Sequence, residues 1–268
     1  MNLLSYIKKN IEIIIFSILV ILFVILLLRR SWEGFFNEQH GINRLDAIIY
    51  INLENRGDRK DLLMKELEKL NTNMGKVHKV SGVFIPKNGH KGCIQSHILA
   101  LNMIKLNKWK RVLILEDDAE LDMSPEAFND LLNKTIDTLD SKYSNWDVIM
   151  LATANKIIDD KIDDMSINVV SLDGSIKEPL PLKIQKLKNA TTSSAYIVKD
   201  TYVDNIINLF NNCNDNMEHS KLSGQGYEYW ALDQKWAELQ IKDNWFVLEK
   251  DPIKQRAIWS TIMSESHT

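Results

Sequence analysis

The sequence has few cysteines and little net charge, and both shortages exclude classes of protein. Only two of the 268 residues are cysteine, Cys93 and Cys213, and they stand far apart. Two cysteines are too few for a disulfide framework and lack the spacing of a zinc motif. Cys93 falls in an apolar helical pattern, so we favour a buried free thiol there over a single bridge. The formal net charge of -3 indicates no broad cationic surface, so we expect no nucleic-acid partner.

The chain also lacks a G-x-x-x-x-G-K loop, internal repeats and low-complexity tracts. A metal-dependent phosphohydrolase or nucleotidyltransferase predicts such a loop or additional acidic motifs. The sequence therefore gives that enzyme class little support, and it stays open as an alternative.

One long apolar run stands near the N-terminus. Residues 13–28 read IIIFSILVILFVILLL, without a charge and with Ser17 as the only polar side chain. Together with residues 11 and 12, the run approaches the length that crosses about 30 Å of hydrocarbon. No small-residue cleavage site follows it, which favours an uncleaved signal anchor over a signal peptide. We expect a short tail over residues 1–10, a transmembrane anchor over 11–28 and a stem over 29–45.

Basic residues flank the run on both sides, with Lys8 and Lys9 before it and Arg29 and Arg30 after it. This balance means that the positive-inside rule does not set the orientation. We expect a single-pass membrane protein, of type II topology with a lumenal catalytic domain if the source is eukaryotic or a virus of a eukaryotic host.

Strand-like and helix-like segments alternate from residue 46 to residue 268. Apolar runs typical of buried strands occur at 46–53, 76–83, 111–115 and 146–151. Helical periodicity follows at 54–70, capped by Asp58, at 89–109, and at 124–140, capped by Ser124 with Pro125 in the first turn. This alternation predicts a parallel, doubly wound α/β sheet over the first two thirds of the domain, with sites at the carboxyl ends of its strands.

The last part of the domain is less regular. Residues 156–181 are charged and poorly patterned, which indicates surface loops with one short strand at 167–172. Residues 191–210 predict a strand followed by a helix. Residues 228–239 predict a helix, and 244–255 predict a strand and a tail.

Three adjacent carboxylates close one of the buried strands. Residues 112–115 are apolar and run directly into Glu116, Asp117 and Asp118. Such charges repel one another unless a cation lies among them, and carboxylate oxygens suit Mn²⁺ or Mg²⁺. Side chains alternate along an extended segment, so we expect Glu116 and Asp118 to face one way and Asp117 the other. A divalent ion here would neutralise a departing diphosphate, whereas the alternative interpretation is a solvated acidic turn.

Four blocks follow one another in the globular part: IYINLENRGDRK, GCIQSHILALN, VLILEDDAEL and SSAYIVK, with weaker tail matches in WALDQKW and KQRAIWSTI. This combination resembles glycosyltransferase family 25, which includes lipopolysaccharide-type and procollagen-type galactosyltransferases. Gln95 departs from the Gly-Cys-x-Leu-Ser-His pattern of the second block. The resemblance implies a nucleotide-diphospho-sugar transferase fold of the GT-A type over residues 46–268, a divalent metal and an inverting transfer.

The resemblance also implies roles on the donor side. Asp118 matches a metal ligand, Glu116 a further ligand or a contact to the sugar nucleotide, and Asp117 a residue that orients the other two. Asn52, Arg56 and Arg59 follow the first strand, where the nucleotide and its phosphates are expected, because arginine binds phosphate with two donors. A solvated cluster in which Arg59 pairs with Asp58 or Asp61 stays open as the alternative.

Two further sets of residues each have more than one interpretation. Ser96 and His97 come from the second block and are expected near the donor, although His97 also fits a hydrogen-bonded core histidine. An inverting transfer needs a base for the acceptor hydroxyl, for which Asp233 is the first choice and Asp117 the second. Tyr227, Tyr229 and Trp230 precede Asp233 and offer either a sugar-stacking wall or ordinary core aromatics, and Asp233 itself also fits an ordinary polar position on a helix.

The function expected from these features is metal-dependent transfer of a hexose from a UDP-sugar. Galactose is the first choice and glucose the second, and the cofactor is Mn²⁺ or Mg²⁺. The acceptor is a glycan, a lipid-linked saccharide or a protein hydroxylysine. A non-catalytic binding protein on a degenerate transferase fold stays open as an alternative, although an intact Glu116-x-Asp118 argues against it.

Overall fold

The computed structural model describes residues 13, 15–26, 40–159, 165–171, 179–220 and 226–257, without the side chains of 218–220. The chain divides into two compact units, Met1–His40 and Gly41–Thr268. The second unit begins five residues before the expected boundary at residue 46. The reason is that a 3-10 turn, η1 (Gly41–Arg44), belongs to it, and Ile42 in this turn and Leu45 directly after it are buried in the core.

Residues 15–26 of the first unit are helical, and the hydroxyl of Ser17 donates to the carbonyl of Ile13 over 2.8 Å. Residues 11, 12, 14, 27 and 28 of the expected anchor lie outside the described residues. Among the residues that the structure describes, no helix is long and apolar enough to cross a membrane.

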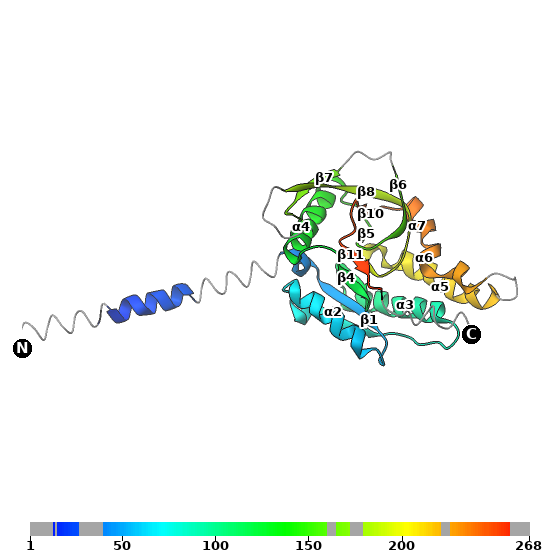
Figure 1. Ribbon diagram of the computed structural model, residues 1–268, viewed down its shortest axis with the longest axis horizontal. Helices are drawn as coiled ribbons and strands as arrows, with labels where there is room; N and C mark the ends of the chain where they lie inside the picture. The colour runs from blue at the N-terminus through cyan, green and yellow to red at the C-terminus, as the bar shows by residue number, and fades with distance from the viewer. Residues whose placement is uncertain are drawn as a thin grey trace, which may run out of the picture. The chain divides into compact units, whose positions relative to one another are not determined.

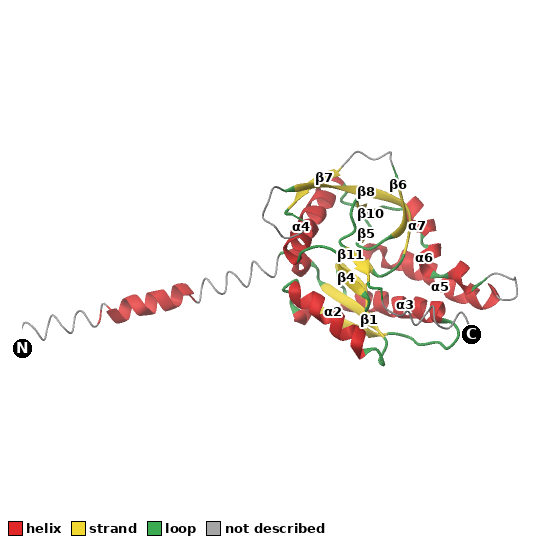
Figure 2. Ribbon diagram, viewed as in Figure 1, coloured by secondary structure: helices red, strands yellow, loops and turns green. Residues whose placement is uncertain are grey.

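The second unit alternates helices and strands along the chain (Figures 1 and 2). Its strands are β1 (Ala47–Asn52), β2 (Val77–Ser81), β3 (Arg111–Glu116), β4 (Ala119–Leu121), β5 (Val148–Met150), β6 (Ala154–Ile158), β7 (Met165–Val169), β8 (Leu180–Thr191), β9 (Ala195–Lys199), β10 (Trp245–Leu248) and β11 (Ile253–Gln255). Its α-helices are α2 (Gly57–Lys69), α3 (Gly89–Asn107), α4 (Pro125–Lys142), α5 (Val203–Ser220), α6 (Leu232–Lys235) and α7 (Ala237–Lys242). Short 3-10 turns are η1, η2 (Met74–Lys76), η3 (Asp200–Tyr202) and η4 (Tyr227–Trp230).

One large sheet forms the centre of the unit, with strand order β2-β1-β3-β9-β5-β10-β8-β6 and with β7 also paired to β8. β1 is parallel to β2 and β3, and β10 is parallel to β5, whereas β8 and β9 are antiparallel to their neighbours. These pairings make every strand of the sheet except β8 and β9 run in one direction. The expected mostly parallel α/β sheet is confirmed, and the two reversed strands are an addition to it.

Side chains of the central strands alternate between two apolar layers. Ile48 and Tyr50 of β1 pack with the leucines of α2 and the apolar face of α4. Ile49 and Ile51 face the opposite way and pack with α3, α5 and Trp236. Burial on both faces explains why these strands are continuous apolar runs in the sequence. It also leaves the ends of the strands as the places where polar side chains gather.

Of the two residues expected to cap helices, Ser124 does so and Asp58 does not. Ser124 caps α4 as expected, because its hydroxyl accepts from the backbone N–H of Ala127 over 3.2 Å and Pro125 begins the helix. The prediction that Asp58 caps α2 is wrong, since Arg56 holds the cap position and Asp58 lies in the first turn. There Asp58 pairs with Arg56, and its negative charge interacts favourably with the positive end of the dipole of α2.

The least regular parts of the sequence contain more structure than was expected. β7 confirms the short strand expected near 167–172, but the charged segment before it also forms β6, and β8 follows it. The helix expected over 228–239 is divided into η4, α6 and α7. The expected tail forms β11, which pairs with β4 in a second, two-stranded sheet.

Candidate functional site

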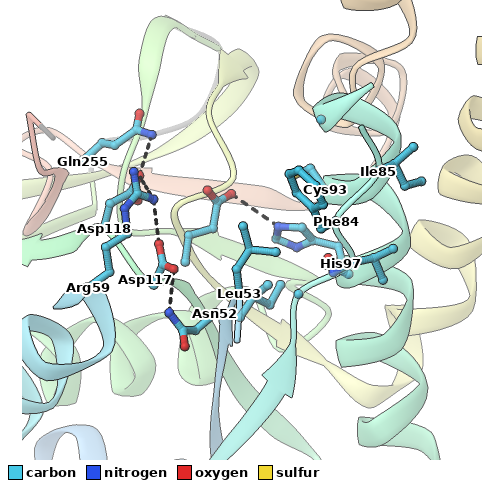
Figure 3. Close-up of a pocket in the computed structure, with 16 residues that line it drawn as sticks. Asn52, Leu53, Arg59, Phe84, Ile85, Cys93, His97, Asp117, Asp118 and Gln255 are labelled. Carbon is cyan, nitrogen blue, oxygen red and sulfur yellow. Dashed lines mark hydrogen bonds and ion pairs between the residues drawn. The ribbon is translucent and has the colours of Figure 1, made fainter. Parts of the chain in front are cut away.

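A pocket opens at the carboxyl ends of β1, β2 and β3 (Figure 3). Seven of the residues expected at the site line it: Asn52, Arg59, Ser96, His97, Glu116, Asp117 and Asp118. Arg56 and Asp233 are not among its lining residues. In Figure 3, Asn52, Asp117, Arg59, Asp118 and Gln255 lie on one side of the pocket, and Phe84, Ile85, Cys93 and His97 lie on the other.

The second wall of the pocket depends on a close approach between α3 and the loop after β2. A side chain at Gly92 would place its Cβ 2.3 Å from the carbonyl oxygen of Val83, so only glycine fits. Ser96 joins the same two segments, because its hydroxyl accepts from Val83 N over 2.8 Å and donates to Gly92 O over 2.7 Å. Ser96 therefore shapes the wall, and a direct contact between Ser96 and a donor stays a prediction.

The acidic turn after β3 already contains a cation. Arg59 Nη1 donates to Asp117 Oδ1 over 2.8 Å and lies 3.7 Å from Asp118 Oδ2. The other oxygen of Asp117 accepts from Asn52 Nδ2 over 2.8 Å. The alternative in which Arg59 pairs with Asp58 or Asp61 is thus replaced by a pair at the pocket. Since both oxygens of Asp117 hold hydrogen bonds, its present geometry fits orientation better than proton transfer.

The three carboxylates do not alternate as expected. Asp117 and Asp118 both lie beside Arg59, whereas Glu116 turns toward α3 and β9. The physical reason is that β3 ends at Glu116 and residues 117 and 118 form a turn, where the two-residue alternation of an extended strand no longer holds.

Glu116 is held by a buried histidine and a serine. His97 Nε2 lies 3.3 Å from Glu116 Oε1, and the hydroxyl of Ser193 donates to the same oxygen. His97 Nδ1 lies 3.0 Å from the hydroxyl of Tyr196, which completes a hydrogen-bonded row. Burial raises the pKa of the Glu116 carboxyl, but His97, Ser193 and Arg59 together outweigh burial, so the net shift of this pKa is downward. His97 is therefore a fully buried histidine and a pocket residue at once.

Of the three carboxylates, Asp118 is the one with a buried oxygen that no described residue hydrogen-bonds. Its side chain is buried, Oδ2 accepts from Gln255 Nε2 over 3.0 Å, and its backbone oxygen accepts from Arg256 N over 2.7 Å. Within the described part of the chain, nothing hydrogen-bonds to Oδ1. Burial, together with the negative charge of Glu116, raises the pKa of Asp118 to about 7. A buried carboxylate with an open oxygen and a raised pKa is the kind of group that a bound cation stabilises.

Arg56 and Asp233 lie near the pocket without lining it. Arg56 Nη2 pairs with Asp58 Oδ2 over 2.9 Å and holds the pKa of Asp58 down at about 2. Asp233, in the first turn of α6, accepts from Thr192 N over 3.0 Å with Oδ2. Thr192 has a φ of 73°, a rare conformation for a β-branched residue that often marks functional sites.

The segment before β9 links Asp233 to Glu116 at the end of β3. Its residue Thr192 contacts Asp233, and the next residue, Ser193, contacts Glu116. Two aromatic residues that precede Asp233 contact a cation. Lys235 Nζ lies 3.6 Å from the ring centre of Tyr229 and 4.5 Å from that of Trp230. Both interpretations of these aromatics remain predictions.

Three site residues were not identified as such from the sequence. Gln255 was noticed only as a weak tail match, and Ser193 only as part of the fourth block. Cys93 is a free cysteine, as expected, but it is half-buried and lines the pocket instead of lying in the core. Its spacing of four residues from His97, one turn of a helix, was the signal that both share a face. Burial raises the pKa of the Cys93 thiol well above its ordinary value, and the charge of Glu116 acts in the same direction.

The departure at Gln95 has a structural consequence away from the pocket. Gln95 Nε2 donates to Asn214 Oδ1 over 3.0 Å and so joins α3 to α5. The substitution therefore affects the packing of helices and leaves the acidic turn untouched.

Comparison with known proteins finds one matching family. The model described as "Glycosyltransferase family 25 (LPS biosynthesis protein)" matches residues 87–221, just over half of the chain. The match contains α3, β3 and β9, whereas the first block and the tail lie outside it. The comparison with curated proteins gives no significant match.

Several solved structures are similar to the chain at low identity. A mannose-1-phosphate geranyltransferase from Thermus thermophilus has 10% identity and a TM-score of 0.40, covering 80% of this chain and 75% of that one. A glycosyltransferase involved in glycosylation of the major capsid of PBCV-1 has 9% identity and a TM-score of 0.42, covering 82% and 96%. A197 from STIV has 10% identity and a TM-score of 0.37, covering 78% and 83%. Likenesses at these TM-scores support no inference about what this chain does.

Proposed function

The chain belongs to glycosyltransferase family 25, and from this premise we propose that it transfers a hexose from a UDP-sugar with the help of Mn²⁺ or Mg²⁺. Galactose is the first choice of hexose and glucose the second. The observation that carries the proposal is Asp118, which lines a pocket at the carboxyl end of β3 and has a buried oxygen, Oδ1, without a hydrogen-bond partner among the described residues. Ligand sites in α/β folds form at this edge of the sheet.

The residues present fit a hard divalent ion. Asp118 Oδ1 lacks a partner among the described residues, and its neighbours Glu116 and Asp117 add negative charge. Oxygen donors of this kind suit Mn²⁺ or Mg²⁺. We assign the ion to Asp118, with Glu116 as a further ligand or a contact to the donor. When bound, the ion supplies positive charge that stabilises the departing diphosphate.

The protein's own residues account for binding and orientation of the donor. Arg59 brings a guanidinium to the same pocket, and Asn52 fixes the orientation of Asp117 against it. Phe84 lines the pocket with 53% of its surface exposed, which offers an aromatic face to a nucleobase. His97 and Ser193 fix the position of Glu116 Oε1 at the pocket. These features favour a GT-A-type donor site over a solvated acidic turn.

An inverting transfer also needs a base on the acceptor side. The acceptor hydroxyl attacks the anomeric carbon and gives up its proton, while the bond from that carbon to the diphosphate breaks. We keep Asp233 as the proton acceptor, because it is linked through Thr192 and Ser193 to Glu116 yet does not line the donor pocket. Asp117 is the second choice, since both of its oxygens already accept hydrogen bonds.

The acceptor and the membrane anchor remain proposals from the sequence. We propose a glycan, a lipid-linked saccharide or a hydroxylysine as acceptor. The apolar run over 13–28 is the basis for proposing a single membrane anchor for residues 11–28, with type II topology.

A donor screen tests the proposed function. Purified protein is incubated with a panel of UDP-, GDP- and CMP-sugars, with Mn²⁺ or with EDTA, and release of the nucleotide is measured. The proposal expects release from a UDP-hexose that EDTA abolishes. Release from a different nucleotide class, or full activity in EDTA, contradicts it.

A further inference from the structure

Three side chains of different chemistry converge on the wall of the pocket opposite Asp117. Cys93 and His97 lie one turn apart on α3, and Glu116 ends β3. The thiol sulfur, one ring nitrogen and one carboxylate oxygen all lie within 4.8 Å of one another. We propose that Cys93, His97 and Glu116 form a binding site for a borderline-soft transition metal ion such as Zn²⁺, in addition to the oxygen-donor site at Asp118.

The ligand types favour zinc over the ion proposed for Asp118. Zinc is bound in proteins by cysteine sulfur, histidine nitrogen and carboxylate oxygen, whereas Mn²⁺ and Mg²⁺ prefer oxygen donors. Three protein ligands with a fourth position open to a cavity is the arrangement of reactive zinc sites. All three residues line the pocket, so an ion can reach them and keep its fourth position there.

The spacing of the donor atoms fits a tetrahedral ion. His97 Nε2 and Glu116 Oε1 are 3.3 Å apart. Two zinc bonds of about 2.0–2.1 Å at a tetrahedral angle place their donor atoms roughly 3.3–3.4 Å apart. This pair therefore needs almost no movement to bind, and the remaining adjustment falls to the half-buried side chain of Cys93.

The partner of the second ring nitrogen supports ligation by His97. With the proton on Nε2, His97 donates to Glu116 and Nδ1 accepts from the hydroxyl of Tyr196, 3.0 Å away. For ligation through Nε2, the ring proton moves to Nδ1, which then donates to Tyr196, and the one proton released to solvent comes from the thiol. A phenol hydroxyl both donates and accepts, so Tyr196 supports both tautomers. Partners of this kind fix the ring and strengthen metal binding.

The surrounding charge also favours a cation. Glu116, Asp118 and Asp233 all lie close enough to Cys93 to act on it electrostatically. Binding converts the thiol to a thiolate, so one proton is released to solvent for each ion bound, and the sulfur–metal bond forms without a change of oxidation state.

Cobalt spectroscopy of the full-length protein tests the site without reference to activity. Co²⁺ bound through a thiolate gives an intense sulfur-to-metal charge-transfer band, and Zn²⁺ should remove it by competition. We expect this band in the wild type, in the control Cys213→Ala and in Asp118→Asn, and its loss in Cys93→Ala. Tyr196→Phe keeps the ring and removes only the hydroxyl, and it should weaken Zn²⁺ binding by ~10–100-fold.

Circular dichroism of each variant establishes that it is folded. A folded wild type without a thiolate band overturns the proposal, as does a band that survives in Cys93→Ala. An unchanged Zn²⁺ affinity in folded Tyr196→Phe overturns the role of Tyr196. Because every readout is metal binding, none of these outcomes depends on whether the proposed UDP-hexose transfer is correct.

Discussion

Arg59 Nη1 lies 2.8 Å from Asp117 Oδ1, which places a cation from α2 inside the acidic turn that follows β3. This pair helps to explain how a buried strand can end in three carboxylates, because the guanidinium of Arg59 balances the negative charge of Asp117. Glu116 is matched by His97 and Ser193. Asp118 keeps a buried oxygen, Oδ1, without a hydrogen-bond partner among the described residues, and it is there that we expect the metal.

Asp118→Asn should lower transfer by ~10²-fold or more, because it removes a charged ligand from the ion that stabilises the leaving diphosphate. The amide is close in size to the carboxylate, so the fold should survive. Turnover and Mn²⁺ affinity should fall together. Asp122→Asn is the matched control, since Asp122 pairs with Lys254 at the surface. Equal activity in the two variants contradicts the assignment of Asp118.

Arg59→Ala should destabilise the protein by about 3–5 kcal/mol, because it leaves the buried carboxylate of Asp117 without its counter-charge. Arg56→Ala, which breaks an exposed pair with Asp58, should cost about 0–1 kcal/mol. Denaturant unfolding of both variants measures the difference. Similar losses in the two variants would show that Arg59 and Asp117 are solvated in solution.

Asp233→Asn should lower turnover by ~10²–10⁴-fold while leaving donor affinity unchanged, because a base acts on the acceptor and not on the donor. Glu238→Gln, at an exposed position of α7, is the control. Donor affinity is measured beside turnover at saturating donor. A loss of affinity with turnover preserved makes Asp233 a donor contact, and no change in either makes Asp117 the leading base.

The stability of the metal-free protein should fall as pH rises toward and through 7. The pKa of Asp118 is about 7 in the folded chain against an ordinary 3.8. The folded state therefore binds more protons than the unfolded state between these values, and the stabilisation present below pH 4 is lost as pH rises. Burial raises this pKa most, Glu116 and Asp117 raise it further, and Gln255 and Arg59 lower it. Thermal unfolding in EDTA at pH 5.5 and pH 8 should show a larger decrease for the wild type than for Asp118→Asn, and Mn²⁺ should reduce it. Equal decreases would place the pKa of Asp118 near its ordinary value.

Deletion of residues 1–30 should leave a folded, active domain, because the second compact unit begins at Gly41 and has its own core. The truncated protein should lose association with membrane vesicles that the full chain retains. Circular dichroism and vesicle sedimentation measure the two effects. Vesicle binding that survives truncation contradicts the anchor, and loss of secondary structure contradicts the independence of the domain.

The central strands and their helices were predictable, because burial on both faces leaves continuous apolar runs such as Ile48–Ile51. An apolar run does not indicate in which direction its strand lies in the sheet. The sequence therefore did not predict that β9 is antiparallel to β3 and β5. The strand β8 was missed for a related reason: many of its side chains are only half-buried, and its lysines interrupt the apolar pattern of a strand.

The site residues that lie at or directly after the end of a buried strand were predictable from the sequence. Asn52 and Glu116–Asp118 were identified for that reason, and they do meet at the pocket. Gln255 and Ser193 reach Asp118 and Glu116 from distant parts of the chain, through pairings that no local pattern encodes. Cys93 was assigned to the core because a cysteine among apolar residues is usually packed there, although its helical face also carries His97.

The most direct test of the account is the release of UDP from UDP-galactose and UDP-glucose by full-length protein with Mn²⁺, and again after EDTA, for the wild type and Asp118→Asn. The account predicts release by the wild type with Mn²⁺, its loss in EDTA, its recovery when Mn²⁺ is restored, and little release by Asp118→Asn under any condition. Release by the wild type that is unchanged in EDTA, or by Asp118→Asn at the wild-type rate, would contradict it.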